Sequence, residues 1–279
     1  MNKFIDMHTH IGRWSVDNQN FSKNQLCDVI NINEAQAFIV SNLDCIDMDE
    51  NGKPRKTEID GNEEILKEFA DVGNAYLLAV CEPNFGSPDN IRKLLNKYPM
   101  SFCGLKLHSE FCKVPADSGK YDGYMEIAQE FKLPCLFHCG YVQSEYSSPR
   151  ELYSLAKRFP TVPVILGHMS TGPVSCKREA VKVMRKSIEN NDALLYGDIS
   201  WCDAEQIVMI VEKLKNTPSG DFTNRILFGT DAPLGPFDSI DGYGAFLAMV
   251  ETVIGSSFDE MTLYNILYSN SKKLFKINI

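Results

Sequence analysis

Short apolar runs alternate with longer amphipathic stretches along the chain, each run beginning roughly thirty residues after the last. The apolar runs predict strands at residues 3–8, 36–41, 74–80, 102–108, 134–138, 163–168, 193–199 and 225–230. The amphipathic stretches predict helices, among them residues 62–72, 87–98, 123–131, 149–159, 175–190 and 204–216. Strands that alternate with helices build a parallel sheet, and eight such units close into a barrel. The pattern therefore predicts an α/β fold, a single-domain (β/α)8 TIM barrel over residues 1–279.

The predicted strand-to-helix loops are longer than the helix-to-strand loops. Residues 11–23, 42–61 and 109–122 lack strong periodicity, whereas Lys132-Leu133-Pro134 leads directly from a helix into a strand. In a TIM barrel all strand-to-helix loops lie on the face where the strands end, and active sites are built there. We therefore expect the long loops to surround a pocket on that face, with a purely solvated excursion as the alternative for the highly charged residues 42–61.

All five histidines lie at or near the ends of predicted strands. His8 and His10 are two residues apart on the first strand, so their side chains face the same side. Each of the other three ends its own apolar run, and these are His108, His138 and His168. A scattered surface population would not end separate strands in this way. The recurrence predicts a common site.

Asp231 follows the last predicted strand and adds a carboxylate to this set. Side chains at the strand ends of a barrel converge on its axis, so residues far apart in sequence can meet. Imidazoles with one carboxylate suit zinc, and also manganese, iron or cobalt. Such a metal lowers the pKa of bound water and makes hydroxide available as a nucleophile. Asp231 could then accept the proton of the attacking water and pass it to the leaving group.

Composition and charge narrow the function further. The chain has 279 residues, 44% of them hydrophobic, with a net charge of −9. That charge argues against a protein that follows a nucleic-acid backbone and favours a small-molecule substrate. No apolar run is long enough to cross a membrane, and the first strand begins near the first residue, so we expect a cytoplasmic protein without membrane contact. A homodimer is as compatible with the sequence as a monomer.

The nine cysteines show no CxxC or zinc-finger spacing. Several lie inside apolar runs, where a small hydrophobic residue would serve equally well. We interpret them as reduced thiols. Cys112 and Cys139 lie near the predicted pocket loops, so a ligand or nucleophile role stays open for these two.

Five ordered segments carry a resemblance to a known family. They are Phe4-Ile5-Asp6-Met7-His8-Thr9-His10-Ile11-Gly12, Gly104-Leu105-Lys106-Leu107-His108, Leu136-Phe137-His138-Cys139-Gly140, Val164-Ile165-Leu166-Gly167-His168-Met169 and Ile226-Leu227-Phe228-Gly229-Thr230-Asp231-Ala232-Pro233. As an ordered set they resemble the metal-dependent amidohydrolase superfamily, most closely its amidohydrolase-2 branch of TIM-barrel hydrolases and decarboxylases. Residues 265–275 are similar to the helix that ends these proteins. The resemblance covers nearly the whole chain.

The resemblance implies one or two divalent metal ions, most often zinc. His8, His10, His138 and Asp231 would hold the metal. His168 would bind a second metal or hydrogen-bond the substrate, and Asp231 and His168 would be the catalytic pair.

Lys106 has three interpretations. In binuclear relatives a lysine on the fourth strand is carboxylated and bridges two metals, and Gly-Leu-Lys-Leu-His is similar to the segment around that lysine in dihydroorotases. Alternatively, the Lys106 ammonium pairs with a substrate carboxylate, or it forms an ion pair inside the barrel. His108, two residues further, would line the pocket or bind metal. Many relatives have proline after this histidine where Ser109 stands here, which leaves the start of that loop open.

Two arginines are further candidates for substrate binding. Arg13 follows the histidine pair, and Arg150 begins the helix after the fifth predicted strand. Either guanidinium could hold a substrate carboxylate with two hydrogen bonds, or be a solvated surface charge. Trp201 follows the seventh predicted strand, but core packing explains it equally well.

The predicted activity is hydrolysis of a small-molecule amide, ester or lactone. The alternative within the same branch is non-oxidative decarboxylation of an aromatic or unsaturated carboxylic acid, which would release carbon dioxide. A TatD-type nuclease shares the opening motif, but it normally supplies a glutamate where this chain has Lys106 and His108. A barrel that binds a metabolite without turnover would be expected to lack a metal ligand, and none is missing.

Overall fold

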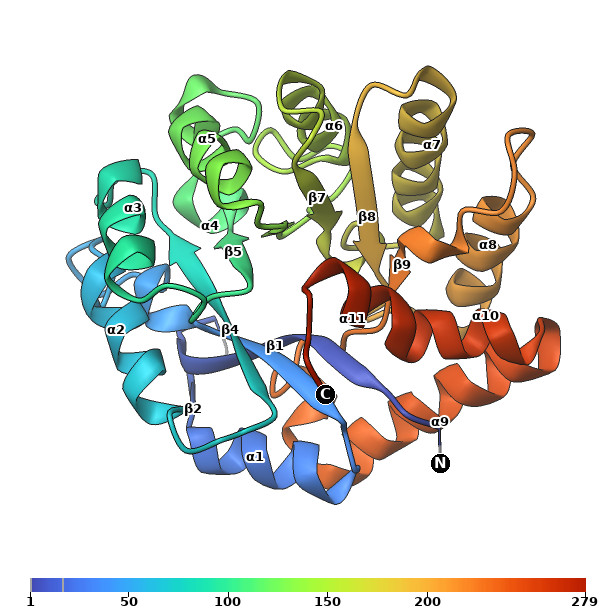
Figure 1. Ribbon diagram of the computed structural model, residues 1–279, viewed down its shortest axis with the longest axis horizontal. Coiled ribbons are helices and arrows are strands. Elements are labelled where there is room, and N and C mark those ends of the chain that lie inside the picture. The colour runs from blue at the N-terminus through green and yellow to red at the C-terminus, as the bar shows by residue number, and fades with distance from the viewer. Residues whose placement is uncertain (1, 17) are drawn as a thin grey trace.

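A computed structural model describes residues 2–16 and 18–279. Its strands form one sheet in the order β2-β1-β3-β4-β5-β6-β7-β8-β9, which curls into a ring (Figure 1). All neighbours from β1 and β3 to β8 and β9 pair in parallel, and only β2 is antiparallel. The strands are β1 (Ile5–Trp14), β2 (Gln19–Phe21), β3 (Ala37–Asn42), β4 (Ala75–Cys81), β5 (Gly104–Leu107), β6 (Cys135–Phe137), β7 (Pro163–Leu166), β8 (Leu194–Asp198) and β9 (Ile226–Leu227).

The ring closes between β1 and the segment that continues from β9. Met7 N donates to Phe228 O at 3.1 Å, and Asp231 N donates to His8 O at 2.8 Å. The two backbones come so close that a Cβ on Gly229 would stand 2.8 Å from the Cβ of His8. Glycine permits this approach because it has no side chain. Closure therefore places the Gly229-Thr230-Asp231 segment beside the histidine pair.

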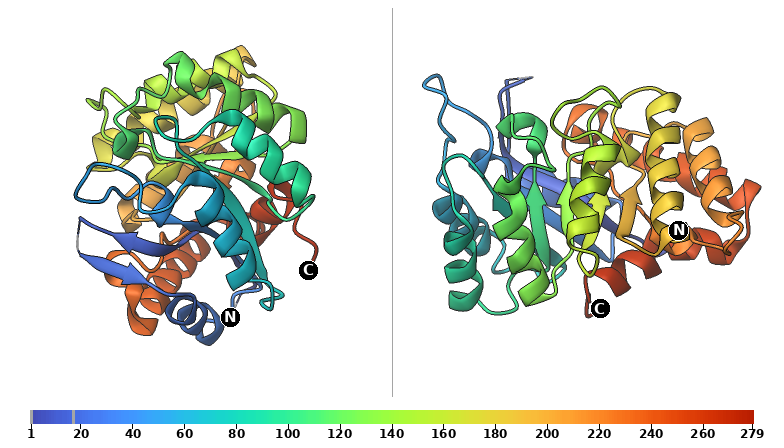
Figure 2. Two further views of the ribbon diagram at one scale, coloured as in Figure 1. Left: turned by 90° about the vertical axis from the view of Figure 1, so that its left-hand side faces the viewer. Right: turned by 90° about the horizontal axis from the view of Figure 1, so that it is seen from above.

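The long helices surround the ring of strands, whereas the short helix α11 lies over one end of it (Figure 1, Figure 2). They are α1 (Lys23–Ile32), α2 (Glu58–Glu68), α3 (Pro88–Lys97), α4 (Ser109–Cys112), α5 (Asp122–Phe131), α6 (Pro149–Arg158), α7 (Val174–Asn190), α8 (Ala204–Lys215), α9 (Ile240–Ser257), α10 (Glu260–Tyr264) and α11 (Asn270–Leu274), with a π-helical segment at Asn265–Ser269. Within the described residues, none of these helices combines the length and apolar character of a membrane span.

The predicted TIM-barrel fold is confirmed, and each predicted strand has its counterpart. One difference lies in residues 11–23, predicted as a loop: β1 continues to Trp14 and forms a hairpin with β2, in which Arg13 faces Asn20. Helices α1 and α9 were not predicted. The α9 helix contains glycines and is apolar around much of its circumference, so the sequence shows no clean amphipathic stripe there.

Along β3 and β6, the barrel interior changes from apolar to polar. One buried cluster includes Ile39 of β3 and Leu136 of β6, together with Tyr268 and Phe275 from the end of the chain. Two residues further along the same strands, on the same side, stand Ser41 and His138. The polar side chains at these strand ends therefore lie directly on an apolar layer. This layer keeps water from reaching them through the opposite end of the barrel.

A buried carboxylate organises the loop after β4. Glu58 Oε1 accepts hydrogen bonds from Glu82 N and from Tyr124 Oη, both at 2.9 Å, and its Oε2 accepts one from Ser87 N at 3.1 Å. Burial raises the pKa of Glu58 to about 7. The folded protein therefore binds a proton at Glu58 more tightly than the unfolded chain does, in which glutamate has a pKa of about 4.3.

This shift makes stability depend on pH. Because the folded pKa is raised, the stabilising contribution of Glu58 is complete below the unfolded pKa and is lost as pH rises through about 7. We expect Glu58→Gln to flatten the fall in unfolding free energy between about pH 5 and pH 8 by up to about 3 kcal/mol. Urea denaturation at several pH values measures this. Equal slopes for the two proteins would contradict the assignment, and Glu212→Gln, at an exposed position of α8, is the control.

Candidate active site

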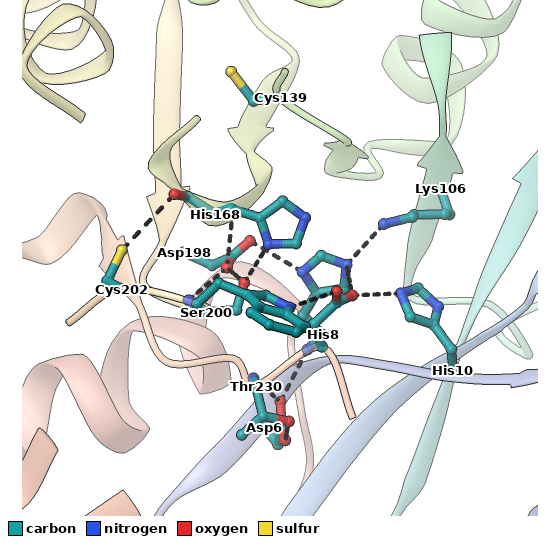
Figure 3. Close-up of polar contacts among 12 residues, drawn as sticks. Asp6, His8, His10, Lys106, Cys139, His168, Asp198, Ser200, Cys202 and Thr230 are labelled. Carbon is teal, nitrogen blue, oxygen red and sulfur yellow. Dashed lines mark hydrogen bonds and ion pairs between the residues drawn. The ribbon is translucent and has the colours of Figure 1, made fainter. Parts of the chain in front are cut away.

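Side chains from several strands converge at the end of the barrel where the strands terminate (Figure 3). Asp231 Oδ1 lies 3.2 Å from His8 Nε2 and 2.9 Å from His10 Nε2. Lys106 Nζ lies 2.7 Å from the same nitrogen of His8. The His168 ring stacks on the His8 ring with a centroid distance of 5.0 Å. The barrel thus brings side chains from β1, from β5 and from the segments after β7 and β9 into one polar cluster.

Three of the imidazoles are oriented by a partner on their other nitrogen. The pairs are His8 Nδ1 with Asp198 Oδ2 at 3.2 Å, His10 Nδ1 with Ser41 Oγ at 2.7 Å, and His168 Nδ1 with Ser200 Oγ at 2.7 Å. Such partners fix the ring orientation and leave the Nε2 of each ring facing the cluster. Asp198 also accepts hydrogen bonds from the Ser200 hydroxyl and from His168 N, so one carboxylate supports two rings.

Asp231 is held on both of its oxygens. Oδ1 faces His8 and His10, while Oδ2 accepts a hydrogen bond from Trp201 Nε1 at 2.8 Å. The backbone of Asp231 has a φ of +74°, a left-handed conformation that costs free energy for any residue other than glycine. Burial raises the pKa of Asp231, although His8 and Lys106 oppose that shift. The side chain therefore binds a proton more readily than an exposed aspartate does.

His168 lies in an unusual backbone segment directly after β7. Its φ of +60° is followed by +46° at Met169 and +75° at Ser170, so three successive residues are left-handed. Lys177 Nζ donates hydrogen bonds to the carbonyl oxygens of His168 and Ser170. These bonds hold the segment in the conformation that turns the His168 ring towards His8.

His138 and His108 form a second pair beside this cluster. Their rings stack in parallel, with a centroid distance of 4.2 Å and an interplanar angle of 6°. The His138 ring also stands 5.1 Å from the His168 ring. His108 Nδ1 accepts a hydrogen bond from Phe111 N and so caps the short helix α4. The five histidines therefore form one continuous group.

Burial sets the protonation of these groups. It lowers the pKa of all five histidines, and the Lys106 ammonium lowers the pKa of each of them further. Neutral imidazole is the form that binds a metal ion. Burial also lowers the pKa of Lys106 to about 8, so a fraction of its amine is uncharged and nucleophilic near neutral pH.

The donor set fits a divalent metal. His8, His168 and Asp231 each offer a ligand atom, all within 4.8 Å of one another. Atoms bound to one ion at about 2.1 Å lie about 3 to 4 Å apart, so small side-chain rotations suffice. The 2.9 Å between His10 Nε2 and Asp231 Oδ1 is already close to that range. Nitrogen and carboxylate donors of this kind suit zinc or manganese.

Two adjoining cavities give access to the cluster, since both are lined by His138, His168 and Asp231. One, of about 50 Å³, lies over Lys106 and His108. The other, of about 340 Å³, is lined in addition by Thr171, Gly172, Lys177 and Trp201. Larger hollows of about 570 and 560 Å³ lie beside α2 and between α7 and α8, and no histidine lines them.

The two arginines predicted to bind substrate are not placed at this cluster. Arg13 is an odd number of residues from His8 and His10 along β1 and lines neither cavity, and its guanidinium donates to Asn18 at 2.6 Å. Arg150 lies on the outer side of α6, 65% exposed, with its Nε 2.7 Å from Glu179 of α7. Strand alternation directs the Arg13 side chain away from the site. The orientation of α6 does the same for Arg150.

Asp198 and Ser200 were not among the predicted site residues, and for Trp201 core packing was an equally good explanation. A signal was present, because Asp198 ends a strand in the same way as the histidines do. Cys139 lies apart from the imidazoles in Figure 3 and lines neither cavity, and burial raises the pKa of its thiol. The pKa of the Cys112 thiol is also raised by burial. These shifts disfavour the thiolate that a nucleophile or ligand requires.

Solved structures share this fold at low sequence identity. A zinc-bound amidohydrolase from Burkholderia multivorans is 13% identical, with a TM-score of 0.67 over 99% of this chain and 100% of that one. A manganese-bound 5-carboxyvanillate decarboxylase from Novosphingobium aromaticivorans is 10% identical, with a TM-score of 0.67 over 99% and 96%. A candidate 2-pyrone-4,6-dicarboxylic acid hydrolase from Pseudomonas putida is 11% identical, with a TM-score of 0.70 over 100% and 99%.

No curated protein matches the sequence. The sequence profile described as amidohydrolase, in contrast, matches residues 5–277, nearly the entire chain. The chain therefore belongs to the amidohydrolase family of metal-dependent TIM-barrel enzymes.

Proposed function

We propose that this enzyme hydrolyses a small-molecule amide, ester or lactone, with His8, His10, His168 and Asp231 as the central site residues. The observation that carries the proposal is the position of Asp231 Oδ1, within 3.2 Å of two imidazole nitrogens and beside an open cavity. A carboxylate in this position can help to hold a metal through one oxygen and handle a proton through the other.

In this proposal each residue has a defined task. His8, His10 and Asp231 would hold the metal, together with His168 or His138, which line both cavities. When bound, the metal supplies Lewis-acid activation of water or of a substrate carbonyl. Asp231 takes the proton from the attacking water and delivers it to the leaving group. Trp201 keeps the second oxygen of Asp231 in place through its indole N–H.

Lys106 and His108 line the smaller of the two cavities. Lys106 Nζ contacts His8 Nε2, the atom that we assign to the metal, so a carboxylated Lys106 could join the ligand set. As an ammonium it would instead attract a negatively charged group of the substrate. His108, stacked on His138, would contact the bound substrate in the smaller cavity.

Decarboxylation of an aromatic or unsaturated acid is the second candidate. The manganese-bound relative with this activity shares the fold over nearly the full length of both chains. The two reactions differ in what leaves the substrate. Hydrolysis consumes water and forms a carboxylic acid. Decarboxylation consumes a carboxylic acid and releases carbon dioxide.

Metal analysis and a substrate panel test the proposal together. We expect the protein purified from metal-supplemented medium to contain about one equivalent of zinc or manganese per chain, and chelation to abolish activity that the metal then restores. The panel contains lactones, amides and aromatic carboxylic acids, with acid release and carbon dioxide release measured in parallel. Protein that stays free of metal under these conditions would contradict the proposal, and carbon dioxide release would establish the second candidate.

A further inference from the structure

Asp198 links two of the imidazoles in the active site (Figure 3). It is fully buried at the end of β8. Its Oδ2 faces His8 Nδ1 at 3.2 Å, and its Oδ1 accepts a hydrogen bond from the Ser200 hydroxyl. The oxygen of that hydroxyl lies 2.7 Å from His168 Nδ1. The contacts therefore run from His8 through the carboxylate and the hydroxyl to His168.

The hydrogen atom between Ser200 and His168 can be assigned from these contacts. An aspartate carboxylate has no hydrogen to donate, and a serine hydroxyl has only one. Asp198 Oδ1 also accepts from the backbone N–H groups of His168 and Ser200, at 3.2 and 3.0 Å, so this oxygen is an acceptor. The hydroxyl hydrogen of Ser200 therefore points to Asp198. The hydrogen bond between His168 and Ser200 then requires a hydrogen on His168 Nδ1.

The same reasoning places a hydrogen on His8 Nδ1, because that nitrogen faces the Asp198 carboxylate. A contact on the other side of the ring supports this assignment. Lys106 Nζ lies 2.7 Å from His8 Nε2, and a lysine ammonium can only donate, so Nε2 is the acceptor. His10 differs from both rings. Its Nδ1 contacts the Ser41 hydroxyl, which can donate or accept and therefore fixes neither tautomer.

We propose that Asp198 is a positioning residue that fixes the tautomers of His8 and, through Ser200, of His168, so that both rings present an unprotonated Nε2 to the active site. Only such a nitrogen can bind a metal ion or take up a proton. His168 then serves as a metal ligand or a proton acceptor and not as a hydrogen-bond donor to the substrate. The proposal rests on the function proposed above only for the use of these nitrogens, since the tautomers themselves require neither metal nor substrate.

NMR spectroscopy of the chelated protein tests the proposal directly. The chemical shifts of the imidazole nitrogens, measured in protein with isotope-labelled histidine, distinguish a hydrogen on Nδ1 from one on Nε2. The loss of one set of signals in His8→Gln and in His168→Gln assigns the resonances. We expect both rings of the wild type to carry their hydrogen on Nδ1.

Two variants should act on different rings. In Asp198→Asn, the two backbone N–H groups require the amide oxygen at the Oδ1 position. The amide nitrogen then faces His8 Nδ1 and donates to it, so the hydrogen of His8 should move to Nε2. His168 should keep its tautomer, because the amide oxygen still accepts the Ser200 hydrogen. Ser200→Ala should do the reverse, since it leaves the His8 tautomer unchanged and removes the partner that fixes His168.

Zinc affinity provides a second measurement. A His8 ring with its hydrogen on Nε2 cannot bind the ion through that nitrogen. Asp198→Asn should therefore weaken zinc binding by about tenfold to a hundredfold, measured by competition with a chromogenic chelator. Asp241→Asn, the same change at an exposed position in the first turn of α9, should leave both the zinc affinity and the histidine signals unchanged.

Two results would overturn the proposal. The first is a hydrogen on Nε2 of His8 or His168 in the chelated wild-type protein, and the second is an Asp198→Asn protein in which His8 keeps its hydrogen on Nδ1. If Asp198→Asn fails to fold, the wild-type spectrum and Ser200→Ala decide. A wild-type protein that has the expected tautomers but binds no zinc or manganese would contradict the metal-dependent function and still support the role of Asp198.

Discussion

Asp231→Asn is expected to lower turnover by about a thousandfold or more while the barrel stays folded. The amide keeps the shape of the side chain but loses the charge that faces His8 and His10, and it cannot take up the proton of the attacking water. Steady-state kinetics on the best substrate of the panel measures the loss, and metal analysis shows how much of it comes from weaker metal binding.

Asp241→Asn is the matched control for this variant. Asp241 lies exposed in the first turn of α9, so the same chemical change there should leave turnover unchanged. A Trp201→Phe variant separates positioning from chemistry. It removes the indole N–H that holds Asp231 Oδ2, together with part of the ring, and keeps the Asp231 carboxylate, so it should cost far less activity than Asp231→Asn. Retained turnover in Asp231→Asn would refute the assigned role.

Asp6→Ala is expected to produce the largest loss of stability, about 3 kcal/mol or more. The carboxylate is fully buried where β1 meets the end of β9. It accepts hydrogen bonds from His8 N and Thr230 N at 3.1 Å, from the Thr230 hydroxyl at 2.6 Å and from the Tyr243 hydroxyl at 2.9 Å. Alanine would leave these buried donors without an acceptor. Urea denaturation monitored by circular dichroism gives the change in unfolding free energy.

The neighbouring Thr9 provides the comparison. Its buried hydroxyl donates a single hydrogen bond to Ile39 O at 2.9 Å. Thr9→Val should therefore cost only about 1 kcal/mol, the usual contribution of one such bond. If Asp6→Ala cost no more than Thr9→Val, the carboxylate would not be the link that closes the barrel.

The barrel and the location of its site could be predicted because both follow from local patterns. Apolar runs at regular intervals determine the strands, and a parallel barrel brings all strand ends to one face. His8, His108, His138, His168 and Asp231 each stand at or near such an end. Their convergence therefore needed no knowledge of individual contacts.

The orientation of single side chains could not be predicted in the same way. Arg13 is close to the histidine pair in sequence, but strand alternation and the hairpin with β2 direct it elsewhere. Arg150 pairs with Glu179 because α6 and α7 pack side by side on the outside. Asp198 also lies at the end of a strand, but only the tertiary contacts reveal that it supports two imidazoles.

The sequence by itself determined the fold, the family resemblance and the group of imidazoles with Asp231, since periodicity and motif order are written along the chain. Only the tertiary structure decided the partners: Asp198 for His8, Trp201 for Asp231, and the carbonyl oxygens of His168 and Ser170 for Lys177. These pairings depend on distances of a few ångströms between separate elements. Such distances result from barrel closure and helix packing, which no local pattern contains.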